Sequence, residues 1–117
     1  MSRDPQLLKG VLPMLVLALL TEAESYGYEL VSRLRADGLT DIGTGTVYPV
    51  LTRLERDGLI TSRLVASTSG PARKYYLPTP AGTAALAASA QDWADLTATT
   101  GAVLGRATDP TRDKDPR

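Results

Sequence analysis

The side chains best suited to recognising another molecule lie in one segment, GTGTVYPVLTRLERDGLI, residues 43–60. Its apolar residues keep helical spacing, and a helix that buries Val47, Leu51 and Leu54 turns the polar residues outward. Arginines on such a face can pair with guanine edges or phosphates, and hydroxyls near a helix N-terminus lie where free N–H groups favour phosphate. The pattern predicts a candidate nucleic-acid-binding surface made of Thr44, Thr46, Tyr48, Pro49, Thr52, Arg53 and Arg56.

A charged outward face is also typical of any solvated surface helix, and acidic residues stand close to both arginines of this one. A second segment favours the nucleic-acid interpretation, because residues 59–79 carry Arg63, Arg73 and Lys74 and no acid. We therefore add Arg73 and Lys74 to the candidate surface. Residues 26–79 hold seven basic and five acidic side chains, and so small an excess predicts moderate binding that weakens strongly with salt.

The composition removes most catalytic chemistries. The 117 residues include no cysteine and no histidine, which excludes disulfides, thiolate or imidazole metal sites and the usual Cys or His catalytic groups. Carboxylates are plentiful, but no pair is placed by a catalytic motif, and no phosphate-binding glycine loop or nucleophile elbow is present. We expect no enzyme activity and no cofactor. Thirteen basic residues balance thirteen acidic ones, so the global charge predicts no partner.

The N-terminal segment predicts an apolar first helix. Asp4 followed by Pro5 is typical of a helix start, and leucine and valine recur at three- and four-residue spacings as far as residue 20. The apolar run over residues 11–20 contains Pro13 and is too short to span a membrane. A signal peptide is the alternative, but an acid in its basic region and the lack of a clean cleavage site favour a buried helix. We expect a cytoplasmic protein with no membrane partner.

The next two helices are expected to end with the same chemistry. The second covers about residues 26–36, with Ser25 as N-cap and Gly38 as the left-handed stop. An Asp-Gly pair also ends the third helix. Pro49 costs little only in a first turn, so the third helix either begins near Thr46 or has an irregular opening turn.

After the third helix the pattern changes to two short runs with β-branched or aromatic residues, LITSRLVA and RKYYLPT, joined by STSGPA. This predicts a β-hairpin in which either Tyr75 or Tyr76 points inward. Thr79 followed by a proline is typical of a helix start, and the alanine-rich residues 80–104 predict a long helix. Residues 105–117 have mixed charges and no large apolar side chain, so we expect a disordered tail.

This order of elements is typical of a winged helix-turn-helix, whose third helix enters the DNA major groove while the hairpin reaches the flanking backbone. The predicted fold class is mostly α (α+β), with a two-stranded β wing and a long C-terminal dimerisation helix. The predicted domains are a DNA-binding domain over residues 1–79, a dimerisation helix over 80–104 and the tail over 105–117.

Three segments in register resemble one protein family. YGYELVSRL, GTGTVYPVLTRLERDGLI and GPARKYYLPTPAG are similar to motifs of the PadR family of bacterial transcriptional regulators, in its short-chain branch. The resemblance covers about residues 7–104 and implies Tyr48, Arg53 and the Arg73-Lys74 pair as DNA contacts. It also implies a homodimer, formed by the C-terminal helix against the partner's N-terminal region, and usually repression of a neighbouring operon.

The last helix carries a sparse heptad-like seam of apolar residues. Mutual packing of this helix with the apolar first helix across a two-fold axis would bury both, and would place two recognition helices one DNA turn apart on a palindrome. The expected interface residues are Leu12, Leu15, Leu86, Trp93, Leu96 and Val103.

Trp93, the only tryptophan, leaves two interpretations open. Plain interface packing suits its large apolar surface. The family resemblance implies instead that Trp93 binds a ligand, since similar PadR regulators of multidrug efflux use a tryptophan in this helix to stack flat aromatic drugs.

The expected function is therefore a sequence-specific DNA-binding transcriptional regulator: a homodimeric repressor of a neighbouring operon, released by a small aromatic effector. The alternative is a winged-helix protein-interaction module that never binds DNA, in which the outward arginines bind an acidic protein surface.

Overall fold

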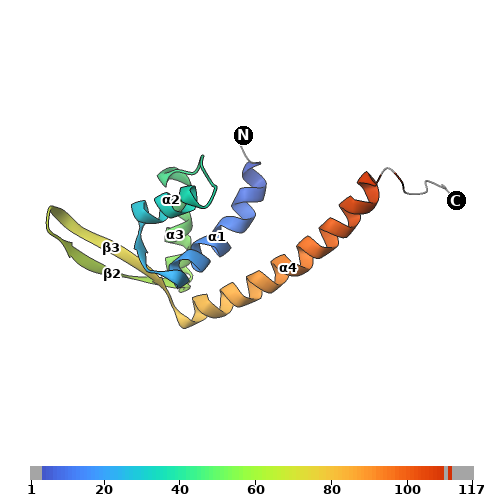
Figure 1. Ribbon diagram of the computed structural model, residues 1–117. Helices are drawn as coiled ribbons and strands as arrows, with labels where there is room; N and C mark the ends of the chain where they lie inside the picture. The colour runs from blue at the N-terminus through green and yellow to red at the C-terminus, as the bar shows by residue number, and fades with distance from the viewer. Residues whose placement is uncertain (1–3, 110, 112–117) are drawn as a thin grey trace.

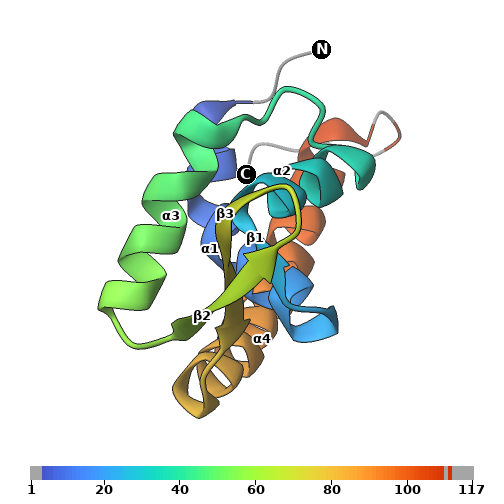
Figure 2. The ribbon, with the colours of Figure 1, turned by 90° about the vertical axis from the view of Figure 1, so that its left-hand side faces the viewer.

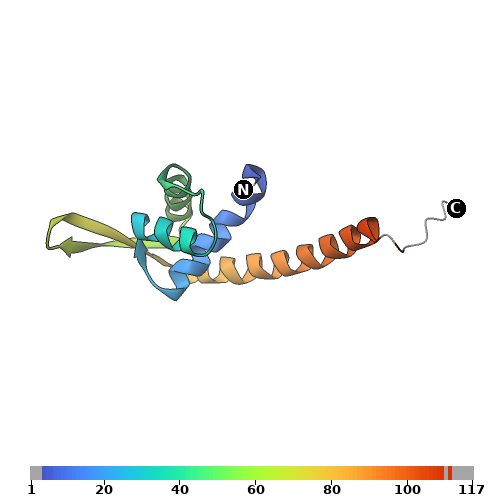
Figure 3. The same cartoon turned by 45° about the horizontal axis from the view of Figure 1, so that its top comes forward.

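The computed structural model describes residues 4–109 and 111. The elements follow in the order α1 (Pro5–Glu22), β1 (Ser25–Tyr26), α2 (Gly27–Ala36), α3 (Thr44–Arg56), β2 (Ile60–Ser67), β3 (Gly70–Pro78) and α4 (Pro80–Thr108). The first three helices form the body of the molecule, and the β2–β3 wing and α4 extend from it in opposite directions (Figures 1 and 3). The predicted α+β winged helix-turn-helix fold is confirmed.

The predicted helix ends are present. The Asp4 carboxylate accepts a hydrogen bond from the backbone N–H of Gln6 (2.9 Å) and caps α1. Both α2 and α3 end on a glycine with positive φ, Gly38 (118°) and Gly58 (76°). After each glycine the next N–H donates back into the helix, as from Leu59 to the Leu54 carbonyl (2.9 Å). Only glycine adopts this backbone without strain, so the repeated Asp-Gly pair ends both helices.

Ser25 is not the N-cap that the sequence predicts. It lies in β1, which pairs antiparallel with β3, so that the sheet has three strands in the order β1-β3-β2. The N-cap of α2 is Tyr26, which makes no side-chain capping bond. The side chain of Ser25 is buried and accepts a hydrogen bond from Nη1 of Arg33 (2.7 Å). Pairing with a distant strand therefore prevails over the local capping preference.

Arg33 joins the C-terminal end of α1 to α2. Besides Ser25, its guanidinium donates to the carbonyl oxygens of Leu19 (2.7 Å) and Ala23 (2.9 Å), and it lies 3.2 Å from the Glu22 carboxylate. The Leu19 carbonyl also accepts from the Ala23 N–H (3.2 Å), so the cation adds a second partner there and supplies one to the Ala23 carbonyl just beyond the helix. Arg33 thus fixes the turn that leads into β1.

The core lies where α1, α2 and α3 meet the base of the sheet. Leu12 is only 1% exposed, because it faces this core. Its place in a dimer interface stays a prediction, and its burial within this chain leaves it little surface for a partner. A helix that is apolar nearly all round does not reveal which side its own domain covers. Leu15 and Leu86 are partly buried against the same core. The buried apolar side chains are those of Leu12, Val16, Leu17, Leu19, Leu20, Leu30, Val31, Leu34, Ile42, Val47, Val50, Leu51, Leu54, Ile60 and Tyr76.

The third helix begins at Thr44 and contains Pro49 in its second turn. Of the two expectations for its start, the irregular opening turn holds. The Gly43 carbonyl accepts from both Thr46 N and Val47 N, each at 3.1 Å. Because Pro49 has no N–H, the carbonyl of Gly45 loses its usual partner in the helix. The opening of α3 is therefore a less regular helix than its remainder.

The last helix runs four residues beyond the predicted boundary at 104, since α4 ends at Thr108. Thr108 Oγ1 donates to the Leu104 carbonyl (2.8 Å), and Arg106 in the last turn complements the helix dipole. Asp109 has extended backbone, as expected of a residue before proline. The expected tail is thus wrong for residues 105–108, and its remainder lies largely outside the described residues.

Among the described helices, α1 alone is long and apolar enough to cross a membrane, by length and composition. Its buried face belongs to the core just described, including Val16, Leu17 and Leu20. A core helix of a soluble protein passes the same test, so this property is weak evidence for a membrane span.

Candidate nucleic-acid interface

The outward face of α3 is exposed along its whole length. Val47, Val50, Leu51 and Leu54 are buried, and every candidate residue on the helix is solvent-accessible, namely Thr44, Thr46, Tyr48, Pro49, Thr52, Arg53 and Arg56. The helix runs beside the hairpin on one side of the molecule (Figure 2). The structure therefore presents the α3 candidates on one continuous helical face.

Tyr48 also meets the wing. It lines a cavity of about 200 Å³ together with Arg73 and Lys74 of β3 and with Tyr26 and Gly27. The opening of α3 and the two predicted cations of the wing are thereby brought together. The aromatic ring of Tyr48 lies so close to Gly27 that a Cβ there would stand 2.5 Å from its hydroxyl oxygen. Gly27 therefore makes room for the Tyr48 ring.

Lys74 is held by an ion pair with α3. Its Nζ lies 3.0 Å from Oε1 of Glu55, and the Ser62 hydroxyl donates to Oε2 of the same carboxylate (2.9 Å). The hydrogen bond from Lys74, followed by that from Ser62, lowers the pKa of Glu55. The hydrogen bond to Glu55 likewise raises the pKa of Lys74. The positive charge of Lys74 is therefore partly neutralised by an acid of α3.

The other two wing cations differ. Arg63 is paired with Glu24, and the hydrogen bond from Arg63 lowers the pKa of that carboxyl. Arg73 has no acid partner in the described part of the chain; its guanidinium lies 4.5 Å from the centre of the Tyr26 ring. A cation over an aromatic face is attracted by the ring without losing its charge. The sequence argument from three wing cations is therefore too strong, because two of them face acids.

On α3 the same distinction holds. Arg56 lies 3.1 Å from its neighbour Asp57, whereas Arg53 makes no ion pair with any residue that the structure describes. Arg53 on the helix and Arg73 on the wing are thus the uncompensated cations of this face. Their positions are those at which a polyanion would gain the most from charge neutralisation.

Sequence reasoning missed the residues that position these groups. Glu24 and Glu55 neutralise two cations, Tyr26 supports Arg73, and Gly27 admits Tyr48. The partners are separated by tens of residues, so no local pattern reveals them. The prediction that one of Tyr75 and Tyr76 points inward is confirmed. Tyr76 is buried, and Tyr75 packs edge-on against Tyr26 with ring centres 5.3 Å apart.

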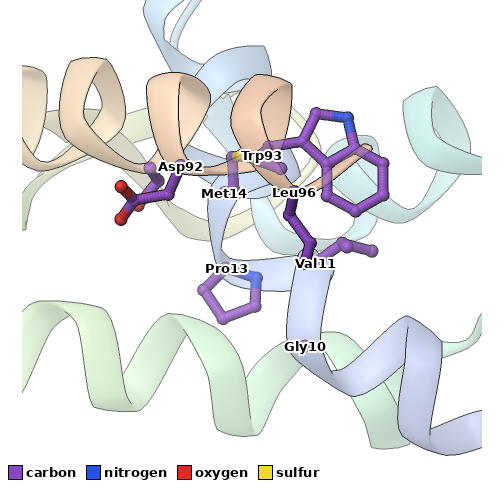
Figure 4. A pocket seen from close by; sticks show the side chains of 8 residues that line it. Gly10, Val11, Pro13, Met14, Asp92, Trp93 and Leu96 are labelled. Carbon is purple, nitrogen blue, oxygen red and sulfur yellow. The ribbon is translucent and has the colours of Figure 1, made fainter. Parts of the chain in front are cut away.

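A second exposed surface lies between α1 and α4. A groove of about 260 Å³ is lined by Val11 and Met14 of α1 and by Trp93 and Leu96 of α4 (Figure 4). Trp93, Leu96 and Val103, all predicted at the interface, are 46%, 59% and 48% exposed. The α1 side of this groove was missed, because the first helix offered no polar face by which to orient it.

Comparison with known families decides what kind of winged helix this is. Residues 16–88 match the Transcriptional regulator PadR-like family, which covers α1 from its middle, the whole winged domain and the start of α4. The chain belongs to the PadR-like family of transcriptional regulators. PadR-like proteins are regulators of transcription, and a DNA-binding regulator with a winged-helix fold is the coarse function that follows.

Solved PadR-like structures share the fold over most of their length. A PadR-like regulator of Bacillus cereus is 39% identical, with a TM-score of 0.77 over 85% of this chain and 96% of that one. A PadR family regulator of Eggerthella lenta is 37% identical, with a TM-score of 0.78 over 85% and 86%. A transcriptional regulator of Mycobacterium tuberculosis is 46% identical over 65 residues, which are 54% of this chain and 57% of that protein.

The chemistry of the interface agrees with a binding role. In the described residues no group of three or more carboxylates is placed to hold a metal ion, and the chain has no cysteine or histidine. The exposed side chains of the PadR-like α3 and wing include hydroxyl donors and cations, which recognise phosphates and base edges. The arrangement can bind a polyanion by charge and shape.

Proposed function

We propose that the protein is a cytoplasmic, homodimeric repressor that binds a palindromic operator beside its own gene. The observation that carries the proposal is that α3 and the wing each present an exposed cation, Arg53 and Arg73, that no described acid neutralises. In a winged helix these two elements meet the major groove and the flanking backbone of DNA. Thr44, Thr46, Tyr48, Pro49, Thr52, Arg56 and Lys74 complete the proposed contact surface.

The dimer is proposed to form through α4. Of this helix only Gly82 is buried, and its apolar residues Trp93, Leu96, Val103 and Leu104 are exposed along one face. The groove between α1 and α4 offers the complementary apolar surface. Two copies related by a two-fold axis would cover both surfaces at once, and Leu7, 72% exposed on α1, would join them.

DNA binding is tested with a labelled fragment from upstream of the gene at increasing salt, measured by gel shift and fluorescence anisotropy. The double variant Arg53→Ala with Arg73→Ala should lose specific binding, because each arginine provides a charge-assisted contact worth about 1–3 kcal/mol. Arg106→Ala removes a cation from the far end of α4 and is the matched control. A folded wild-type dimer that forms no specific complex at low salt would contradict the proposal and favour a protein-interaction module.

Release by a small aromatic effector is the further part of the proposal. Trp93 lines the groove between α1 and α4 and is half-exposed there, so a planar aromatic molecule could stack on its ring. Because Trp93 is the only tryptophan, its fluorescence reports this site alone. An effector should quench the fluorescence and weaken the DNA complex together, and a panel of planar dyes that does neither rules this part out.

A further inference from the structure

The N-terminus of α4 is locked onto the C-terminal end of the recognition helix. The hydroxyl of Thr79 donates to the Gly58 carbonyl (2.7 Å) and accepts from the Gly82 N–H (3.0 Å). The backbone N–H of Thr79 donates to the Leu59 carbonyl (3.1 Å). One threonine therefore caps α4 and at the same time holds the turn that ends α3.

The contact between the start of α4 and the turn after α3, which we call the joint, is close because Gly82 has no side chain. It is the buried residue of α4, and a Cβ on it would stand 1.9 Å from the carbonyl oxygen of Leu59 and 2.9 Å from the carbonyl carbon. Non-bonded carbon and oxygen atoms approach only to about 3.3 Å. The obstructing atoms of Leu59 belong to the backbone, and a Cβ is fixed to the backbone of its own residue. No side-chain rotation therefore relieves the contact. The closeness of the two elements depends on glycine at this position.

The joint also holds both strands of the wing. Thr79 follows directly on Pro78, which pairs with Ile60 at the base of the hairpin, and Leu59 N bonds to the Leu54 carbonyl of α3. Recognition helix, wing and α4 therefore meet in one set of backbone contacts around Leu59. These contacts help to fix the direction in which α4 leaves the winged domain, together with the packing of Leu86 against the core and of α4 along α1.

We propose that Gly82 and Thr79 are positioning residues that set the separation of the two recognition helices, and hence the half-site spacing that the dimer prefers. This inference rests on the proposed function, because it assumes dimerisation through α4 and binding to a palindrome. With α4 fixed in the dimer, opening this joint tilts the winged domain relative to α4. The 13 residues of α3 are about 20 Å long, so a pivot of about 10° at its C-terminal end moves its N-terminus by about 3.4 Å, one base-pair step.

The substitution Gly82→Ala should open the joint. Relief of the contact needs about 1.4 Å at a point about 4.5 Å along the axis from Thr79, a tilt on the order of 15–20°. The matched control is Gly105→Ala in the same helix, where a Cβ meets nothing within 4 Å. Both variants place alanine in a helix, which by itself favours folding, so they differ in the contact with Leu59.

The angle is measured within one protomer. The chain has no cysteine, so Thr52→Cys on α3 and Ala98→Cys on α4 give two unique spin-label sites, both exposed. Chains carrying both labels are mixed with excess unlabelled protein, so that each dimer holds one labelled pair. Gly82→Ala should shift the interspin distance by at least about 3 Å, in proportion to the tilt, and Gly105→Ala should leave it unchanged.

The spacing is measured with operators whose half-sites are moved apart or together by one and two base pairs. Gly82→Ala should remain a dimer by sedimentation, lose at least tenfold in affinity at the wild-type spacing, and recover affinity at a shifted one. An unchanged interspin distance, or a changed distance with the wild-type spacing preference, would overturn the proposal.

If Gly82→Ala does not fold, Thr79→Val decides, because it removes the shared hydroxyl without adding bulk. It should broaden the distance distribution and flatten the spacing preference, and a wild-type result in both would overturn the proposal. If the wild-type protein binds none of the operators, the proposed function fails, but the interspin distance still tests the joint itself.

Discussion

The winged domain and α4 differ in where their apolar side chains lie. The domain buries most of its leucines and valines in a core of its own, whereas α4 buries one glycine and leaves Trp93, Leu96, Val103 and Leu104 exposed. Most helical stability in proteins comes from packing of an apolar face. The comparison teaches that the domain is stabilised from within, whereas the exposed apolar face of α4 would gain the same stabilisation only in the proposed dimer.

The largest effect is expected in the domain core. Leu51 is fully buried on α3, so Leu51→Ala should lower the free energy of unfolding by about 3–4 kcal/mol, through lost apolar burial and the cavity left behind. Chemical denaturation measures it. Leu64→Ala, at a wing position that is 73% exposed, is the control and should change stability by less than about 0.5 kcal/mol. Similar losses for the two would show that the core is not where the domain's stability resides.

The next largest effect should be on dimerisation rather than on the stability of the winged domain. Leu96→Glu places a charge on the exposed apolar face of α4 and should weaken the dimer by about 3 kcal/mol, or roughly 100-fold in Kd, because two leucines lose their burial. Sedimentation measures the dissociation constant. Ala98→Glu lies on the opposite face of the helix and should leave it within about threefold. A dimer indifferent to Leu96→Glu would place the seam elsewhere.

The hydrogen bonds of a half-buried arginine should also contribute more to the stability of the domain than an exposed ion pair does. Arg33 donates to Leu19, Ala23 and Ser25, so Arg33→Met should cost about 2 kcal/mol of unfolding free energy through the loss of these hydrogen bonds. Thermal denaturation compares it with Arg56→Met, whose lost partner is an adjacent, exposed aspartate and whose effect should stay below about 0.5 kcal/mol. Equal effects would mean that Arg33 acts by charge alone.

The smallest effect concerns Glu55. Its pKa is lowered in the folded protein, chiefly by Lys74, so its contribution to stability is present at neutral pH and is lost as the pH falls through that lowered value. Glu55→Gln should therefore reduce the difference in Tm between pH 7 and pH 3 by a small amount. It also frees Lys74, so DNA affinity at low salt should rise and the salt slope should steepen by about 0.9. A slope unchanged from wild type would remove Lys74 from the contact surface.

The features that the sequence predicted well are those determined by neighbours along the chain. The Asp-Gly stops of α2 and α3, the Asp4 cap and the Thr79 cap each depend on a few adjacent residues. The outward face of α3 follows from helical geometry alone. The order of elements in the winged helix and the family motifs were likewise predicted from residues that are neighbours in the sequence.

The features that it missed depend on residues brought together by the fold. Ser25 pairs with Tyr76 instead of capping a helix, and Glu24 reaches Arg63 across the sheet. Leu12 belongs to the core of its own domain, and an all-round apolar helix cannot reveal which side that core covers. Charge counting failed at the wing for the same reason: the neutralising acids belong to other elements.

The contact between Gly27 and Tyr48 makes two positions in different helices interdependent. The end of the Tyr48 ring occupies the space of the missing side chain, so the effect of an exchange at one position depends on the residue at the other. Gly27→Ala should displace the Tyr48 ring, and Tyr48→Ala should remove this effect by emptying the space. In this family's sequences the two sites should accordingly change as a pair, which makes them a marker of how α2 and the recognition helix evolve together.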